Sequence, residues 1–192
     1  MITQTSELQA VNIMLSAIGE APVNTLNGSG LPQEAVVARS TLNETSISVQ
    51  SEGWNFNTQR NVRLVPDVDG NLVVPSNCVH IYPVEPKPCP QVTLRGTRVF
   101  NLTEGTNWFK GPVSVDMVLL LDFNDLPQPA RRYITARASR LFQQRFVGSQ
   151  VLDSFVLEEE TRARHDLLAY ETREGNWNML DGSFSMVGML RR

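Results

Sequence analysis

The chain has 192 residues, of which 41% are hydrophobic and 19% are charged, and these shares exclude an intrinsically disordered protein. Its length allows one compact domain or two small ones. The formal net charge of -3 at pH 7 is mild, so bulk charge gives no sign of a nucleic-acid or membrane partner.

Two amphipathic helices are predicted at the start of the chain. The first covers about residues 6–18, and Ser6 and Gln9 have the spacing of a capping box at its start. The second covers about residues 32–52. Its inward stripe consists mostly of small side chains, which predicts close approach of a neighbouring helix, and contains Ala35, Ala38, Leu42, Thr45 and Val49.

The pattern changes to β-strands after Trp54. Segments 62–65 and 72–74 flank a short loop that ends in glycine, and this arrangement predicts a β-hairpin. Four prolines between Pro83 and Pro90 exclude a central strand there, so this stretch is a loop or the edge of a sheet.

Two further β signals follow. Segments 91–95 and 98–102 are expected to pair around a Gly-Thr turn. Segment 113–123 is the strongest strand signal, and its continuous apolar run from Met117 to Leu121 predicts burial on both faces. That run is far too short to span a membrane, and the N-terminal residues do not resemble a signal peptide.

Helical periodicity returns after Asp125, with a third helix ending near Phe146 and a fourth covering about residues 150–174. The expected fold class is therefore α+β. A four-helix domain is built from both chain ends (1–53 and 125–175), and a β-rich domain (54–124) is inserted between helices two and three. Residues 176–192 are expected to form an extended C-terminal tail with apolar anchors, namely Trp177, Met179, Leu180, Phe184 and Met186.

Charge is unevenly divided between the last two helices, since the third carries five arginines and no acid while the fourth is rich in acids. Two interpretations stay open. The charges pair between neighbouring helices of one subunit, or basic and acidic faces meet across a subunit boundary and close a ring. Phosphate binding by the arginine face is a third interpretation. The candidate inter-subunit residues are Arg131, Arg132, Arg137, Arg140, Arg145, Glu158, Glu159 and Glu160.

Arginine also outnumbers lysine by 15 to two over the whole chain. Arginine makes directional, bidentate pairs, so this bias suits fixed interfaces, although the base composition of the genome explains it equally well.

No pattern in the chain predicts a catalytic, cofactor or metal site. Cys78, His80 and Cys89 match no zinc-module spacing, and neither cysteine has a supporting spacing to His165. The consecutive glutamates 158–160 point in different directions on a helix, whereas a glycosidase acid pair must face one sugar bond. We therefore expect no enzyme activity, no cofactor, no metal, and two free thiols in a reducing cytoplasm.

Several colinear segments resemble the tail tubular protein A family, the head-to-tail adaptor or gatekeeper of T7-like short-tailed bacteriophages. They are spread over nearly the whole chain, and residues 76–112 are the least similar part. Ala21 stands where the family pattern leads us to expect a second proline. The matching segments are Ala10–Asn12, Ile18–Val23, Thr25-Leu26, Gly28, Gln50–Asn57, Leu64–Asp67, Leu126-Pro127, Ala138–Arg140, Phe142, Arg145-Phe146, Glu158–Glu160, Ala163-Arg164 and Asn178–Gly182.

The resemblance implies a structural virion protein, assembled in the host bacterial cytoplasm, that forms a dodecameric ring. It implies a portal protein above the ring, a tail nozzle protein (tail tubular protein B) below it, tail fibres docked near the adaptor–nozzle junction, and double-stranded DNA passing through the lumen without sequence-specific contacts. Because some members are credited with polysaccharide hydrolysis, the alternative is a dual-role tail protein. A DNA-binding completion protein is a third possibility, and it predicts salt-dependent retention of DNA.

Overall fold

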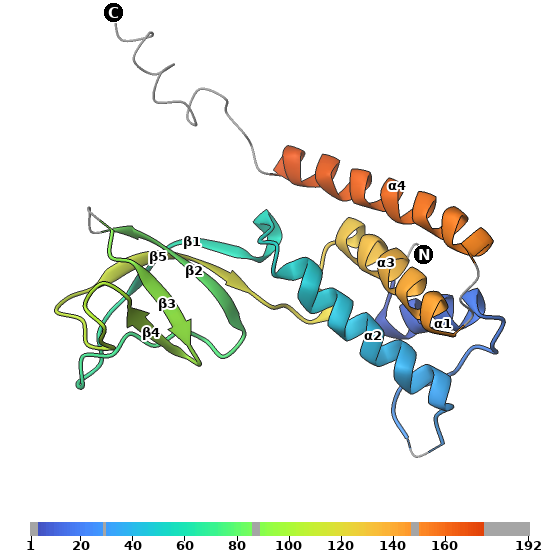
Figure 1. Cartoon of the computed structure of the whole chain (residues 1–192), viewed down its shortest axis with the longest axis horizontal. Coiled ribbons are helices and arrows are strands. Elements are labelled where there is room, and N and C mark those ends of the chain that lie inside the picture. The colour runs from blue at the N-terminus through green and yellow to red at the C-terminus, as the bar shows by residue number, and fades with distance from the viewer. Residues whose placement is uncertain (1–3, 29, 86–88, 147–149, 175–192) are drawn as a thin grey trace, which may run out of the picture.

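The structure is a computed structural model that describes residues 4–28, 30–85, 89–146 and 150–174 (Figure 1). The α+β class expected from the sequence is confirmed, with helices gathered at one end of the long axis and strands at the other. The elements are α1 (Glu7–Ala17), α2 (Gln33–Gln50), the 3-10 helix η1 (Asn55–Asn57), β1 (Thr58–Leu64), β2 (Cys78–Glu85), β3 (Val92–Arg95), β4 (Arg98–Asn101), β5 (Val113–Leu119), the 3-10 helix η2 (Phe123–Asp125), α3 (Gln128–Phe146) and α4 (Gln150–Glu174).

The helices begin and end close to where the sequence places them. At the start of α1, the Ser6 side chain accepts from the Gln9 backbone N–H at 3.2 Å, and the Gln9 side chain accepts from the Ser6 N–H at 3.1 Å. The predicted capping box is therefore confirmed. The small-residue stripe of α2 is buried, and Ala35, Ala38 and Leu42 are each at most 1% exposed.

Helix α3 lies at the centre of the helical domain. Helices α1, α2 and α4 each pack against it, and α1 also packs against α2. In the described part of the chain, α1 and α4 have no comparable contact with each other, so they flank α3 on separate sides. Tyr133, Ile134 and Phe142 of α3 are at most 1% exposed and form the middle of this core.

The strands form a three-stranded antiparallel sheet, in the order β1-β5-β2, and a β3-β4 hairpin. The predicted pairing of segments 91–95 and 98–102 is confirmed. Central strand β5 carries three consecutive buried residues, Met117, Val118 and Leu119, which confirms burial on both of its faces. Pro83 lies in the edge strand β2, where one side of the backbone needs no ladder partner.

The predicted hairpin between segments 62–65 and 72–74 is wrong. Strand β1 pairs with β5, while segment 72–74 runs beside β4, where Val74 N–H donates to the Thr97 carbonyl at 2.9 Å. The physical reason is a set of contacts between residues far apart in the sequence. Strand β5 forms an antiparallel ladder with β1, and segment 72–74 buries Leu72 against the β3-β4 hairpin. Between them, the Asp67 carboxylate accepts backbone N–H groups of Asp69 and Asn71 and closes the loop on itself.

Among the described residues, no helix is both long and apolar enough to cross a lipid bilayer. The same residues hold two separate apolar cores, one among the helices and one between the sheet and the hairpin.

Candidate assembly surfaces

The charged residues of α3 and α4 meet along an antiparallel pair of helices. Arg132 bonds to Asp166 at 3.1 Å, and Arg140 bonds to Glu160 at 2.5 Å. The Arg132 pair is more than half exposed, so solvent screens it and it adds little to stability. The Arg140 pair is more buried, with side chains 22% and 12% exposed. Pairing within one subunit, one of the two open interpretations, describes these four residues.

Arg131 lies inside the helical domain and is 6% exposed. Its guanidinium donates to the backbone carbonyls of Leu126 at 2.6 Å and Thr5 at 3.0 Å, and also to that of Asn124. These bonds tie α3 to the segment before α1. In this structure Arg131 therefore joins parts of one chain and offers almost no surface to another.

Arg137 belongs to a polar cluster between α2, α3 and α4. Arg137 and Arg164 both donate to the Tyr133 hydroxyl, at 3.1 and 3.0 Å, and both face Glu52, at 3.5 and 3.7 Å. The hydrogen bond to Tyr133 raises the pKa of Arg164 above its ordinary value, with the charges of Glu52 and Glu160 acting in the same direction. The cluster fastens the end of α2 to the other two helices.

Three of the candidate residues remain at the surface of the helical domain. Arg145 donates to the Thr41 hydroxyl at 3.0 Å and lies 3.4 Å from Glu44, both on α2. Glu158 pairs with Arg162 one turn further along α4. Glu159 is exposed and has no ion pair among the described residues.

A groove of about 420 Å³ lies between α1 and α4, with α3 as its floor. It exists because α1 and α4 do not close over α3. The floor positions 128, 132, 135, 136 and 139 recur at helical spacing and are mostly small. Ser139 is 6% exposed, and its hydroxyl has no hydrogen-bond partner in the described part of the chain. The rim carries Ile13 from α1 and Glu159 from α4.

Two buried side-chain amides fasten the helical domain to the β domain. The Gln50 side-chain oxygen accepts the Leu121 N–H at 2.7 Å, and its side-chain NH2 donates to the Leu121 carbonyl at 3.0 Å. Asn57 donates to the carbonyls of Gln50 at 2.8 Å and Leu119 at 2.9 Å, and accepts from the Trp54 N–H at 2.9 Å. Gln50 and Asn57 are 1% and 3% exposed. They hold together the two segments in which the chain crosses between domains.

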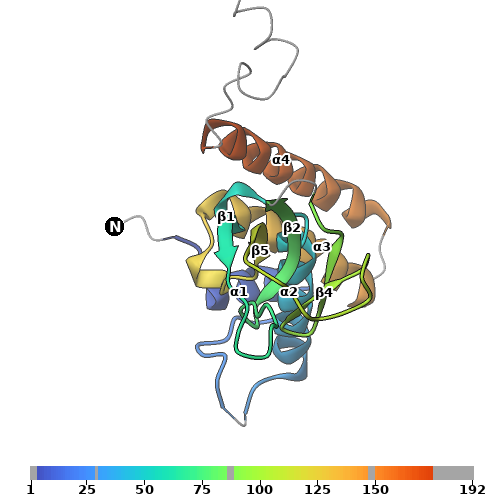
Figure 2. The same cartoon turned by 90° about the vertical axis from the view of Figure 1, so that its left-hand side faces the viewer.

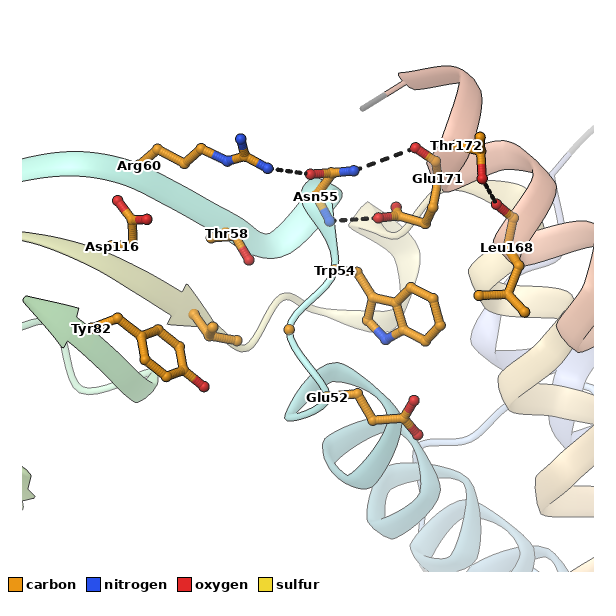
Figure 3. Close-up of a pocket in the computed structure, with 12 residues that line it drawn as sticks. Glu52, Trp54, Asn55, Thr58, Arg60, Tyr82, Asp116, Leu168, Glu171 and Thr172 are labelled. Atoms are coloured by element: carbon orange, nitrogen blue, oxygen red, sulfur yellow. Dashed lines mark hydrogen bonds between the residues drawn. The ribbon is translucent and has the colours of Figure 1, made fainter. Parts of the chain in front are cut away.

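A pocket of about 570 Å³ opens beside this junction, between α4 and the outer face of the sheet (Figure 3). Asn55 spans it, since its backbone N–H donates to the Glu171 carboxylate at 2.6 Å and its side chain accepts from Arg60 at 2.7 Å. Glu171 is 9% exposed, and its second carboxylate oxygen has no partner among the described residues. Asp116 and Tyr82 line the opposite wall.

No set of three His, Cys, Asp or Glu side chains in the described ranges is arranged to hold a metal ion. Cys78 is buried and Cys89 is exposed, and both are free thiols. Burial raises the pKa of the Cys78 thiol.

Sequence reasoning missed the groove and the amide junction. The sequence held one signal for the junction. Gln50 is a polar residue near the predicted end of the second helix, and Asn57 is a polar residue shortly before the first predicted strand. The groove carried none, since its lining comes from three helices. The predicted tail anchors Trp177, Met179, Leu180, Phe184 and Met186 lie outside the described residues.

Comparison with known proteins identifies a protein family and a relative that the chain resembles in sequence. A family model described as tail tubular protein matches residues 8–177, a range that reaches from α1 past the end of α4. The chain is also similar to the tail tubular protein A of Klebsiella phage KP34, with 33% identity over 128 residues. That alignment covers 67% of this chain and 66% of the relative, slightly less than two thirds of the relative's own length.

Proposed function

We propose that this chain, which belongs to the tail tubular protein family, is the ring-forming adaptor that joins the portal to the tail nozzle of a short-tailed phage. Family membership makes it a structural protein of a bacteriophage tail, located in the virion. The proposal adds a ring of about twelve copies, assembled in the host bacterial cytoplasm, with tail fibres docked near the contact with the nozzle.

The observation that carries the proposal is the family match over residues 8–177, which takes in both domains. The fastened junction supports it, because an adaptor must hold its upper and lower contacts at a fixed relative position. Gln50 and Asn57 provide that connection through buried hydrogen bonds instead of a free linker. In this proposal the helical domain forms the ring and the β domain faces the nozzle and fibres.

The C-terminal residues are proposed to hold the portal protein. Aromatic residues and methionine are enriched at protein interfaces, and the apolar anchors of this segment are mostly of these types, namely Trp177, Met179, Leu180, Phe184 and Met186. Deleting residues 176–192 is expected to abolish portal binding while the helical content measured by circular dichroism changes little. Portal binding that survives the deletion would contradict this assignment.

The lumen of the ring is proposed to carry double-stranded DNA during ejection. Twelve copies at -3 each would give the ring a formal charge of about -36, so bulk charge would not retain DNA. A conduit needs this property, because DNA must slide through it. Retention of DNA by the isolated chain that weakens steeply with salt would instead favour a DNA-binding completion protein.

The deciding experiment is a mass measurement of the purified chain with and without purified portal protein. The expected result is one discrete assembly in which several copies join each portal ring. A chain that stays monomeric and never joins the portal would overturn the adaptor function.

A second candidate function is polysaccharide hydrolysis, and the junction pocket is the observation in its favour. It gathers the carboxylates of Glu52, Asp116 and Glu171 near the half-exposed Tyr82. All three carboxylates already serve the fold, since Glu52 faces two arginines, Asp116 accepts the Asn61 N–H at 2.7 Å and Glu171 accepts from Asn55. Release of reducing sugar from host polysaccharide, abolished by Glu171→Gln, would establish this activity, and its absence would leave the structural role alone.

A further inference from the structure

We infer that the groove between α1, α3 and α4 receives the outer face of α2 from a second copy of this chain. The inference rests on the proposed ring and names the surfaces that close it. A head-to-tail contact joins two different patches, and both patches must lie on different sides of one subunit for the assembly to continue around a ring.

The outer face of α2 is the apolar and polar ridge that the groove would receive. Val36, Ser40, Asn43 and Ile47 are all exposed and follow each other at helical spacing, so they lie on one side of α2. Val36 is 54% exposed and Ile47 is 50% exposed. Within the described chain these two apolar side chains pack in neither hydrophobic core.

The groove and the ridge agree in length. The floor of the groove runs from Gln128 to Ser139, which is about 16 Å along α3 at 1.5 Å per residue. The ridge from Val36 to Ile47 has the same number of residues and is therefore also about 16 Å long. A helix laid along the part of this floor with small side chains, Thr135, Ala136 and Ser139, approaches closely and packs its ridge between the flanking helices.

The two surfaces face different sides of the subunit. In Figure 2, α4 crosses the top of the helical domain, α1 lies below it on the left and α2 on the right. The groove opens between α1 and α4, whereas the ridge lies opposite the buried stripe of α2, and its Asn43 and Ile47 end borders a pocket formed with residues 120–123. One copy can therefore receive a neighbour in its groove while presenting its own ridge to the next copy.

One charged group of the groove lacks, among the described residues, an ion-pair partner that a neighbouring copy can supply. Glu159 at the rim has no ion pair within the described ranges. Arg145 of α3 donates to Thr41 of α2 and so lies beside the ridge. The bond of Arg145 to Glu44 is 3.4 Å long and more than half exposed, so exchanging it for Glu159 of a neighbour costs little.

The first test measures self-association of the full chain by sedimentation velocity. Ile47→Arg places a charge in the contact and is expected to lower the association constant at least about tenfold, without unfolding, because the side chain is exposed in one subunit. Leu168→Arg, on α4 beside the junction pocket and similarly exposed at 43%, is the matched control and is expected to have no effect. Charge reversal gives a second arm, in which Glu159→Arg weakens association and the added Arg145→Glu restores it.

The second test adds one cysteine to each variant in a Cys89→Ser background, where the buried Cys78 is the other thiol, and uses a mild chemical oxidant to form disulfides. Ile13→Cys at the groove rim and Ile47→Cys on the ridge should form disulfide-linked dimers on mixing, and far fewer when either variant is oxidised alone. Assemblies that survive Ile47→Arg and give no mixed disulfide would overturn this interface but leave the ring function intact. A chain that stays monomeric with and without portal protein would overturn both.

Discussion

Changing Asn57 to aspartate tests whether the buried amide junction fastens the two domains. The variant keeps the oxygen that accepts the Trp54 N–H at 2.9 Å, but it removes the N–H groups that donate to the Gln50 and Leu119 carbonyls. At pH 7 it also places a carboxylate, 3% exposed in the parent residue, against two carbonyl oxygens at 2.8 and 2.9 Å. The ionised form is therefore strongly disfavoured in the folded state.

The size of the effect follows from the lost bonds. The Gln50 carbonyl still accepts the Gly53 N–H at 3.1 Å, so the Leu119 carbonyl bears the main loss, and a buried group left without a partner costs about 1–3 kcal/mol in the neutral form. Burial and the facing carbonyls raise the folded-state pKa of this carboxyl above its unfolded value of about 3.9. The folded protein then binds more protons than the unfolded one at this carboxyl, so its contribution to stability is fully present below about pH 4 and falls by about 1.4 kcal/mol per unit as the pH rises toward the folded pKa.

Urea unfolding followed by circular dichroism between pH 4 and 8 measures this effect. The expected result is a free energy of unfolding that drops more steeply with pH for Asn57→Asp than for the parent chain. Asn27→Asp, in the exposed loop between α1 and α2, is the control and should follow the parent profile. Parallel pH profiles for Asn57→Asp and the parent, with midpoints within experimental error, would refute the assignment of Asn57 as a buried fastening residue.

Three other predictions concern the β domain. The exposed Cys89 should react with a thiol reagent in the folded protein, while Cys78 should react only after unfolding, because it is buried and burial raises its thiol pKa; equal rates in the folded chain would contradict this. Gly70→Ala should destabilise the β domain by about 1–3 kcal/mol and change the Trp108 fluorescence. The reason is that φ at Gly70 is +79° and an added Cβ would lie 2.3 Å from the Trp108 ring. Gly96→Ala, where an added Cβ meets no atom within 4 Å, should lower the free energy of unfolding by less. Hydrogen bonds from the Asn71 and Asp69 N–H groups lower the pKa of Asp67. This carboxylate therefore contributes stability above its unfolded pKa of about 3.8, and the contribution is lost as the pH falls through the lower folded pKa. Asp67→Asn should reduce this loss of stability at acid pH, as measured by unfolding at a series of pH values.

The helices could be read from the sequence because their signals are local. The capping box at Ser6 and Gln9, the small stripe of α2 and the apolar run of β5 all use residues within a few positions of each other. The β3-β4 hairpin was found for the same reason, since its turn is two residues long. The hairpin predicted for segments 62–65 and 72–74 failed because β1 prefers a distant strand, which no short window of sequence reveals.

The charged residues of α3 and α4 show where the sequence is ambiguous. Its composition identified a basic helix followed by an acidic one, but it could not separate pairs within a subunit from pairs between subunits. The fold places Arg131 inside the chain, engages Arg137 and Arg140 with acids of the same chain, and leaves Glu159 without an ion pair in the described ranges. Burial and partner distance, on which the choice between the two interpretations depends, exist only after folding.

The sequence by itself determined the α+β class, the order of the helices, the capping of α1 and the resemblance to a phage tail family, because each depends on nearby residues or on their order along the chain. Only the tertiary structure decided which strand pairs with β1, how Gln50 and Asn57 fasten the domains, and where a groove stays open over α3. The hydrogen bonds between the two segments of the junction join residues more than 60 positions apart, such as Asn57 and Leu119, whose contact depends on the packing of both cores.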